Sequence, residues 1–199
     1  MLEADFVQLV KTQLSQHFEG IGFVPLDAAC CNPDTTLLRI RIPRKLYFDQ
    51  SETIGPLEYA PRCLPLHHLD LRIRYSKDVS TQLPRSAQLT KHLAGVGCWS
   101  FQGEELAAPA DYWILVLASQ QKTGPCCFVV PTHVLLTYLS HSEPRGQLHL
   151  CLTQAGIGYL ISCLDSANLE QHLFSGGKPT GAEQGWCGRL SDWNQLLAC

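Results

Sequence analysis

The chain has 199 residues, 45% of them hydrophobic, and its formal net charge at pH 7 is −3. This length suits one domain of ordinary size, and the composition excludes a disordered or collagen-like chain. Charged residues make up only 17% of the chain, below the roughly one quarter usual for a soluble domain, which indicates that a partner covers some of the surface. The acidic balance excludes a uniformly basic coat for nucleic acid but not a local basic face.

We expect a cytoplasmic protein that does not enter a membrane. The longest apolar run, residues 112–118, is far shorter than the roughly 20 residues of a membrane span. Glu3 and Asp5 stand where a secretory signal would carry basic residues. The ten cysteines contain no C-x-x-C spacing, so free thiols are favoured over a structural zinc site. Those in apolar runs are expected to be buried: Cys127, Cys151 and Cys163.

The first half of the chain predicts a helix followed by two alternating strands. Apolar residues recur at three- and four-residue spacing over residues 2–18 and stop at Gly20, which is typical of an amphipathic helix. A short extended piece is expected at 21–24. Residues 37–42 and 69–75 alternate with period two, so each predicts a strand with one charged and one apolar face. The proline-rich interval 49–66 predicts a loop.

The remaining expected elements follow in chain order. They are a helix at 86–94 that stops at Gly95 and Gly97, a hairpin of strands at 111–118 and 126–130, a helix at 132–140 capped by Thr132, strands at 148–152 and 159–163, a helix at 166–174, a loop at 176–185 and a helix at 192–197. Together they predict an α/β (α+β) fold in a single domain, residues 1–199, with a mixed central sheet flanked by helices.

The two alternating strands carry the candidate chemistry. Asp34 just before the first strand, and Asp70 and Arg72 on the polar face of the second, can meet at one end of a sheet. Two carboxylates can hold Mg²⁺, and a cation beside them can stabilise a phosphoryl transition state. The motifs of serine hydrolases, phosphate-loop enzymes, dinucleotide enzymes and zincins are absent.

In the order of its elements the chain resembles the restriction-endonuclease-like, or PD-(D/E)XK, superfamily. The likeness is carried by Pro33-Asp34, by Asp70-Leu71-Arg72 and by a later strand that ends in Val130-Pro131 before a helix. It implies a restriction-endonuclease-like fold and a metal-dependent phosphodiesterase, with Asp34 and Asp70 as magnesium ligands and Asp34, Asp70 and Arg72 as catalytic residues. Arg72 replaces the lysine of the family motif, and a guanidinium does not release its proton at working pH.

Two registers of this motif stay open. In the second register Arg72 and Arg74 take both motif positions, while Leu37 or Leu38 stands where the metal-binding aspartate belongs, so the site has no activity. The sequence therefore supports an active Mg²⁺-dependent endonuclease and a degenerate, binding-only domain about equally.

Basic residues gather on the same two strands. Seven of the 15 lysines and arginines lie there or just beyond: Arg39, Arg41, Arg44, Lys45, Arg72, Arg74 and Lys77. Such a stripe suits a phosphate backbone, and we expect its members other than Arg72 to bind nucleic acid, although an acidic protein would fit it equally. The bland alternative is a solvated strand face.

The histidine pair beside Asp70 and the four tryptophans each have more than one interpretation. His67 and His68, beside Asp70, are either exposed loop residues or a proton carrier and metal ligand. The four tryptophans are expected to be core or interface anchors. A competing function is a non-catalytic subunit of a protein assembly or a homo-oligomer, docking through residues 54–66 and 186–197.

Overall fold

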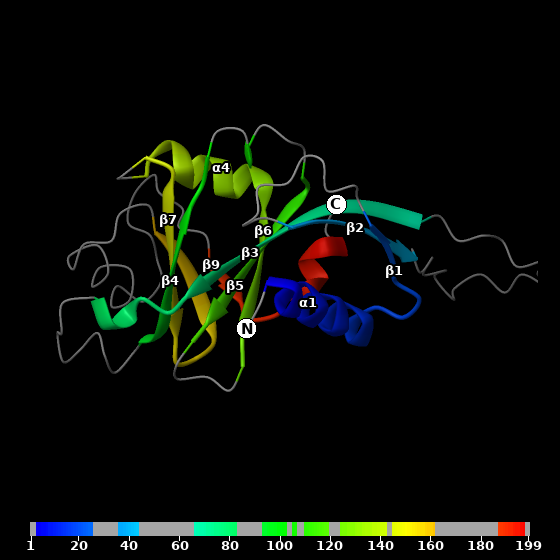
Figure 1. Ribbon diagram of the computed structural model, residues 1–199, viewed down its shortest axis with the longest axis horizontal. Coiled ribbons are helices and arrows are strands. Elements are labelled where there is room, and N and C mark those ends of the chain that lie inside the picture. Colours follow the sequence, from blue (N-terminus) through cyan, green and yellow to red (C-terminus); the bar gives the residue numbers. More distant parts are fainter. Residues whose placement is uncertain are drawn as a thin grey trace, which may run out of the picture.

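The computed structural model describes residues 3–25, 36–43, 66–82, 93–102, 105–106, 110–119, 124–142, 145–161 and 187–197. Figure 1 shows their arrangement. The elements are α1 (Glu3–His17), β1 (Gly22–Pro25), β2 (Thr36–Pro43), β3 (Leu66–Lys77), the 3-10 turn η2 (Ser80–Gln82), β4 (Leu93–Ser100), β5 (Tyr112–Ala118), β6 (Cys126–Pro131), α4 (Thr132–Ser140), β7 (Gln147–Thr153), β8 (Ile157–Ile161), β9 (Cys187–Arg189) and the 3-10 helix η3 (Trp193–Leu197).

The strands form two sheets. The first is mixed and has the order β1-β2-β3-β5-β6, in which β3 and β5 are parallel and the other pairs are antiparallel. The second has the order β4-β7-β8-β9 and is antiparallel throughout. The long strand β3 runs through the middle of the molecule, from the β1–β2 end to the neighbourhood of β4 (Figure 1).

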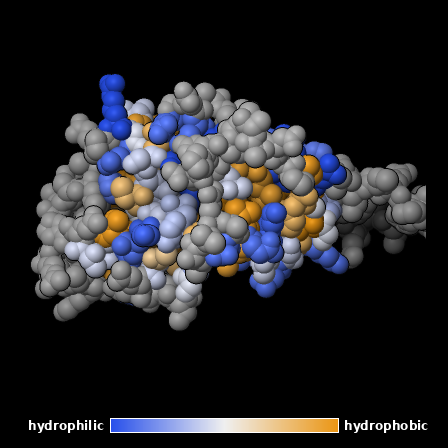
Figure 2. All heavy atoms as spheres, viewed as in Figure 1, coloured by the Kyte–Doolittle hydropathy of each residue, from blue (hydrophilic) through white to orange (hydrophobic). Residues whose placement is uncertain are grey.

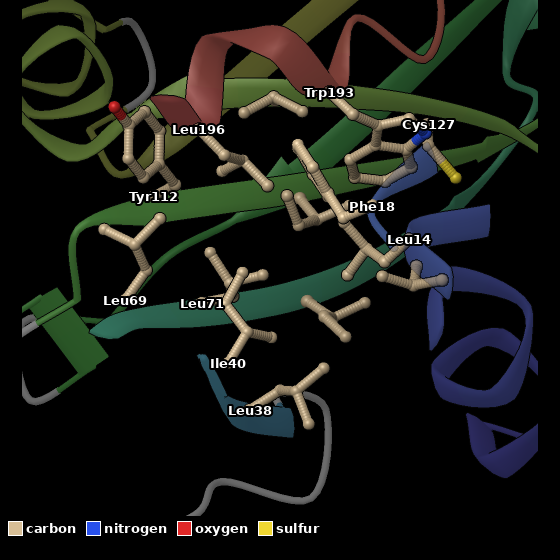
Figure 3. Packing of buried hydrophobic residues seen from close by; sticks show 14 of the residues in the cluster. Leu14, Phe18, Leu38, Ile40, Leu69, Leu71, Tyr112, Cys127, Trp193 and Leu196 are labelled. Atoms are coloured by element: carbon tan, nitrogen blue, oxygen red, sulfur yellow. The ribbon is translucent and has the colours of Figure 1, made fainter. Parts of the chain in front are cut away.

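One core lies between the first sheet and the helix α1. The apolar side chains that alternate along β2 and β3 meet the apolar stripe of α1, as the two periodicities require. Figure 3 shows Leu14 of α1 and Phe18, which follows the helix, packed in one cluster with Leu71 of β3 and with Trp193 and Leu196 of η3. The turn η3 is fixed there because the Tyr112 hydroxyl donates to the Gln195 carbonyl at 3.0 Å.

A second core lies between the two sheets. Apolar side chains of β5 and β6 pack there against β4, β7, β8 and α4. The sheets approach closely where the Phe128 ring lies on Gly158, because a Cβ on that glycine would stand 2.5 Å from the ring. A residue with a side chain at this position would push the layers apart.

The two sheets are joined along the edge of β4 that faces β3. Backbone groups of β4 on this edge bond mainly to side chains: the Cys98 amide donates to Ser76 Oγ at 2.9 Å, and the Val96 amide donates to Asp78 Oδ1 at 3.0 Å. Further along, Arg74 donates to the Ser100 carbonyl. Side chains two residues apart at the end of β3 and just beyond it therefore bond to β4 on the side where no described strand pairs with it, and we call Arg74, Ser76 and Asp78 the β3 clasp.

Most expected elements are confirmed. The opening helix, the extended piece, the two alternating strands, the hairpin, the helix at 132–140 and the strands near 148–152 and 159–163 all appear close to their expected bounds. The mixed α+β class is confirmed, while a second sheet accompanies the expected mixed one. The expected helix at 166–174 lies outside the described residues.

The helix expected at 86–94 is wrong at its end, because Leu93 and Ala94 begin strand β4. Gly95 and Gly97 do not stop a helix but lie within this strand. Gly97 is needed because the Trp99 ring folds back over it, and a Cβ there would stand 2.2 Å from that ring. Residues 86–92 lie outside the described part.

Two smaller expectations are also corrected. Thr132 is not the helix cap: Pro131 holds that position, and the Thr132 hydroxyl donates to the Ala110 carbonyl at 2.6 Å instead. The final helix is a 3-10 turn, Trp193–Leu197.

The expected environments of the cysteines and tryptophans are confirmed where the structure describes them. Cys127 and Cys151 are buried free thiols, and burial raises the pKa of Cys127 to about 12. Trp99, Trp113 and Trp193 are buried, whereas Cys163 and Trp186 lie outside the described residues. Within the described ranges, no helix has the length and apolarity to cross a membrane.

The β3 clasp predicts the effect of Ser76→Ala. The substitution leaves the half-buried Cys98 amide without its acceptor, so we expect the free energy of unfolding to fall by about 1–3 kcal/mol. Urea unfolding measures it. Lys77→Ala, at the exposed neighbouring position, is the matched control and should change stability by less than about 0.5 kcal/mol. Equal losses in the two variants would contradict the clasp.

Candidate functional site: a charged face of the first sheet

The candidate residues share one face of the first sheet. On β3, Asp70, Arg72 and Arg74 alternate with the apolar residues that face α1. Arg39 of β2 stands opposite Asp70, and Trp113 of β5 stands beside Arg72. The second sheet covers the Arg74 end of this face, while Arg39 and the β1–β2 end are more exposed among the described residues.

Arg39 and Asp70 form a bidentate ion pair. Arg39 Nε donates to Asp70 Oδ1 at 2.6 Å, and Arg39 Nη2 donates to Oδ2 at 2.7 Å. The hydrogen bonds from Arg39 lower the pKa of Asp70, and the same bonds raise the pKa of Arg39. Asp70 is therefore ionised, and each of its oxygens is already bonded to a guanidinium.

Asp111 is a member of this face that sequence reasoning missed as a site residue. Its Oδ2 accepts the Asp70 amide at 2.7 Å, and its own amide donates to the Asp70 carbonyl at 2.8 Å. Its charge also contributes to the raised pKa of Arg39. The available signal was an aspartate placed directly before the apolar run of β5, because parallel strands bring such positions to one edge of the sheet.

Arg74 forms a buried ion pair with Glu105, the second residue that the sequence did not single out. Arg74 Nη1 lies 3.1 Å from Glu105 Oε2, and both side chains are at most 10% exposed. Glu105 Oε2 also accepts the Gln102 amide at 3.2 Å, and the Arg74 guanidinium lies 5.0 Å from the centroid of the Phe101 ring. These contacts of Arg74 are therefore all with buried groups of the protein.

Arg72 is buried between these two ion pairs and has no carboxylate partner among the described residues. It is 5% exposed, and its guanidinium lies 5.4 Å from the centroid of the Trp113 ring. Its Nε and the Trp113 Nε1 are both enclosed and lack a hydrogen-bond partner. The solvated strand face considered above therefore does not describe Arg72 and Arg74.

The expected basic stripe is divided by this arrangement. Arg39 is paired, Arg72 and Arg74 are buried, and Arg41 is exposed on the same face. Lys77 is exposed at the far end of β3, where alternation puts it on the opposite face. Asp34, Arg44 and Lys45 lie outside the described residues, so their distances to the face are not given by the structure.

The two histidines differ. His68 is exposed next to Arg41, its cross-strand partner, and its charge helps to lower the pKa of Asp70. His67 alternates to the opposite face, and its Nε2 is enclosed without a partner. Of the pair, His68 lies with the candidate residues.

The face suits anions better than a metal ion. Mg²⁺ requires oxygen ligands, and Asp70 offers no oxygen that is not already bonded to Arg39. Within the described ranges, no three His, Cys, Asp or Glu side chains come together as a metal-binding group. Arg41 and His68, by contrast, present donors toward the open side.

The ion pair of Asp70 predicts a pH-dependent stability. Because the pKa of Asp70 is lower in the folded chain than in the unfolded one, its contribution is present above the ordinary carboxyl pKa of about 3.9 and is lost as the pH falls through the folded value. Asp70→Asn should therefore destabilise the protein at pH 7, and the difference from wild type should close in acid. Denaturant midpoints measured between pH 7 and pH 2 test this.

The double variant supplies the control. In an Arg39→Met background the guanidinium is gone, so the pH dependence of the Asp70→Asn effect should shrink. An undiminished dependence in that background would assign it to another neighbour of Asp70.

Comparison with known proteins identified no relative of the chain: no family model, no curated protein and no solved structure matches it.

Proposed function

We propose that this chain is a nuclease-like domain that binds nucleic acid through the open end of the charged face and does not cleave it. The bidentate pair between Arg39 and Asp70 is the observation that favours binding over catalysis. It occupies the carboxylate that a phosphodiesterase would use for Mg²⁺. In the second register of the motif, Arg72 and Arg74 are the degenerate motif positions, and the buried ion pair of Arg74 with Glu105 agrees with a structural use of that position.

The binding surface consists of Arg41 and His68, with Arg39 beside them. Arg41 and His68 are cross-strand partners, so their side chains are neighbours on the same face. Neither side chain has a hydrogen bond to another described residue, and Arg39 keeps 42% of its side chain exposed despite its pairing. A phosphate backbone passing over this end of the sheet would meet three nitrogen-bearing side chains.

Fluorescence anisotropy with labelled single-stranded DNA, duplex DNA and RNA tests the proposal. We expect binding that weakens with salt, and Arg41→Ala should weaken it for all sequences while reducing the salt slope by about 1. Arg145→Ala, an exposed arginine in the turn before β7, is the matched control and should bind as wild type does.

A cleavage assay with Mg²⁺ separates the two registers. We expect no product from the wild-type chain. Mg²⁺-dependent cleavage that Asp70→Ala abolishes would instead establish the active enzyme, with Asp34 and Asp70 as the ligands to examine. Absence of binding at low salt to all three nucleic acids would reject the binding role.

A protein-docking role is the second candidate, and a different surface favours it. Hydrophobic residues gather over η3 and beside α1 in Figure 2. Leu190 and Leu197, from the C-terminal region expected to dock, are 36% and 49% exposed. Self-association of the purified chain that Leu197→Lys reverses would favour this candidate.

A further inference from the structure

We propose that Arg72 and Trp113 form a recessed binding site for a phosphate group. The two residues are register partners on the parallel strands β3 and β5, so their side chains leave the same face of the sheet side by side. The inference rests on the proposed function only in naming phosphate as the anion. The site itself is argued from burial, charge and hydrogen bonding.

The first argument is the charge of Arg72. Along this face of β3, Asp70 is neutralised by Arg39 and Arg74 is neutralised by Glu105. Arg72 lies between them, is 5% exposed and forms no ion pair with any described residue. A buried guanidinium without a counter-ion is costly, and contact with an aromatic ring offsets only part of that cost.

The second argument is a pair of unused donors. Arg72 Nε and Trp113 Nε1 are enclosed and have no acceptor. Trp113 is held in place because its ring meets Phe101 edge to face, with 5.2 Å between the ring centroids, and Phe101 in turn lies under Arg74. The guanidinium of Arg72 and the indole of Trp113 are thus two donors for which the described residues supply no acceptor.

The remaining carboxylate of this face does not fill that role. Asp111 uses Oδ2 to accept the Asp70 amide and forms no ion pair with Arg72. A phosphate oxygen fits better, because the planar fork of a guanidinium binds two oxygens of one phosphate and the indole adds a third donor.

The position of Arg72 supplies the access. Its β2 partner Leu37 is only half-buried, and Asp70 on the open side is also partly exposed, whereas Arg74 on the other side is covered by β4. Arg72 itself is buried, 5% exposed against 9% for Arg74, and Leu37 and Asp70 are its partly exposed neighbours. A phosphate at the end of a chain, or free phosphate, reaches a buried arginine more easily than a phosphate within a duplex does.

Isothermal titration of the full chain with inorganic phosphate, at constant ionic strength against chloride, tests the site. We expect saturable binding that weakens about tenfold or more in Arg72→Met and by a smaller factor in Trp113→Phe. Arg145→Met, which changes an exposed arginine, should bind phosphate as wild type does. Absence of phosphate binding by the wild-type chain, or equal affinity in Arg72→Met, would overturn the proposal.

Folding of the variants is checked without phosphate. Arg72→Met replaces an unpaired buried charge with an apolar side chain of similar length, so its unfolding midpoint should equal or exceed that of wild type. Arg74→Met, on the same face of the same strand, breaks the pair with Glu105 and should lower the midpoint. Arg72→Lys provides a second folded variant, which keeps the charge but loses the fork and should bind phosphate more weakly.

Two oligonucleotides identify the source of the phosphate. A 5′-phosphorylated strand that binds more tightly than its unphosphorylated twin, with the gain lost in Arg72→Met, assigns the site to a nucleic-acid end. Phosphate binding without that gain assigns it to free phosphate. Because phosphate binding is measured without nucleic acid, the phosphate site can be disproved while nucleic-acid binding is retained. Likewise, nucleic-acid binding can be disproved while the phosphate site is retained.

Discussion

The structure depends on how the free edge of β4 is satisfied. Among the described strands β4 pairs with β7 alone, and an unpaired strand edge inside a protein would leave amides and carbonyls without partners. The β3 clasp supplies these partners from side chains: Ser76 and Asp78 accept β4 amides, and Arg74 donates to a β4 carbonyl. The end of β3 is thereby bonded to a strand of the second sheet as well, and the second core lies between the two sheets.

This constraint decides what the charged face of β3 can do. The bond to the Ser100 carbonyl holds the Arg74 guanidinium in the interior, so clasping β4 removes it from the binding surface. Glu105 is then required beside it, because the guanidinium is buried where water cannot screen its charge. Among the described residues, the end of the face that β4 does not reach, around Arg39 and Arg41, is the more exposed part and is open to an external partner.

Local pattern predicted the elements that are amphipathic by themselves. The spacing of α1 and the alternation of β2 and β3 each show one apolar face, and those faces meet in the first core. β4 could not be predicted in this way, because Leu93–Ser100 contains two glycines and an alanine, which are poor strand formers. Its partners, β7 and the β3 clasp, lie 18 to 60 residues away and determine its conformation.

The sequence predicted which residues of the candidate site share a face, but not the environment of each one. Alternation placed Asp70, Arg72 and Arg74 on one face, but their separate environments come from distant partners: Arg39 is 31 residues from Asp70, and Glu105 is 31 residues from Arg74. A charged strand face usually lies in water, and nothing within residues 69–75 indicates that a second sheet covers half of it. Asp111 was overlooked for the same reason, since its neighbour Asp70 is 41 residues away.

The gradient of burial along β3 gives the face its direction. Arg41 on β2 is exposed, Asp70 is partly exposed, and Arg72 and Arg74 are both buried. A charge must be neutralised by a protein group where water is excluded and can be left free where water is present. Asp70 and Arg74 follow this rule. Arg72 lies at the depth where a counter-ion is needed and the described residues supply none, which is the arrangement expected where the partner comes from outside the chain.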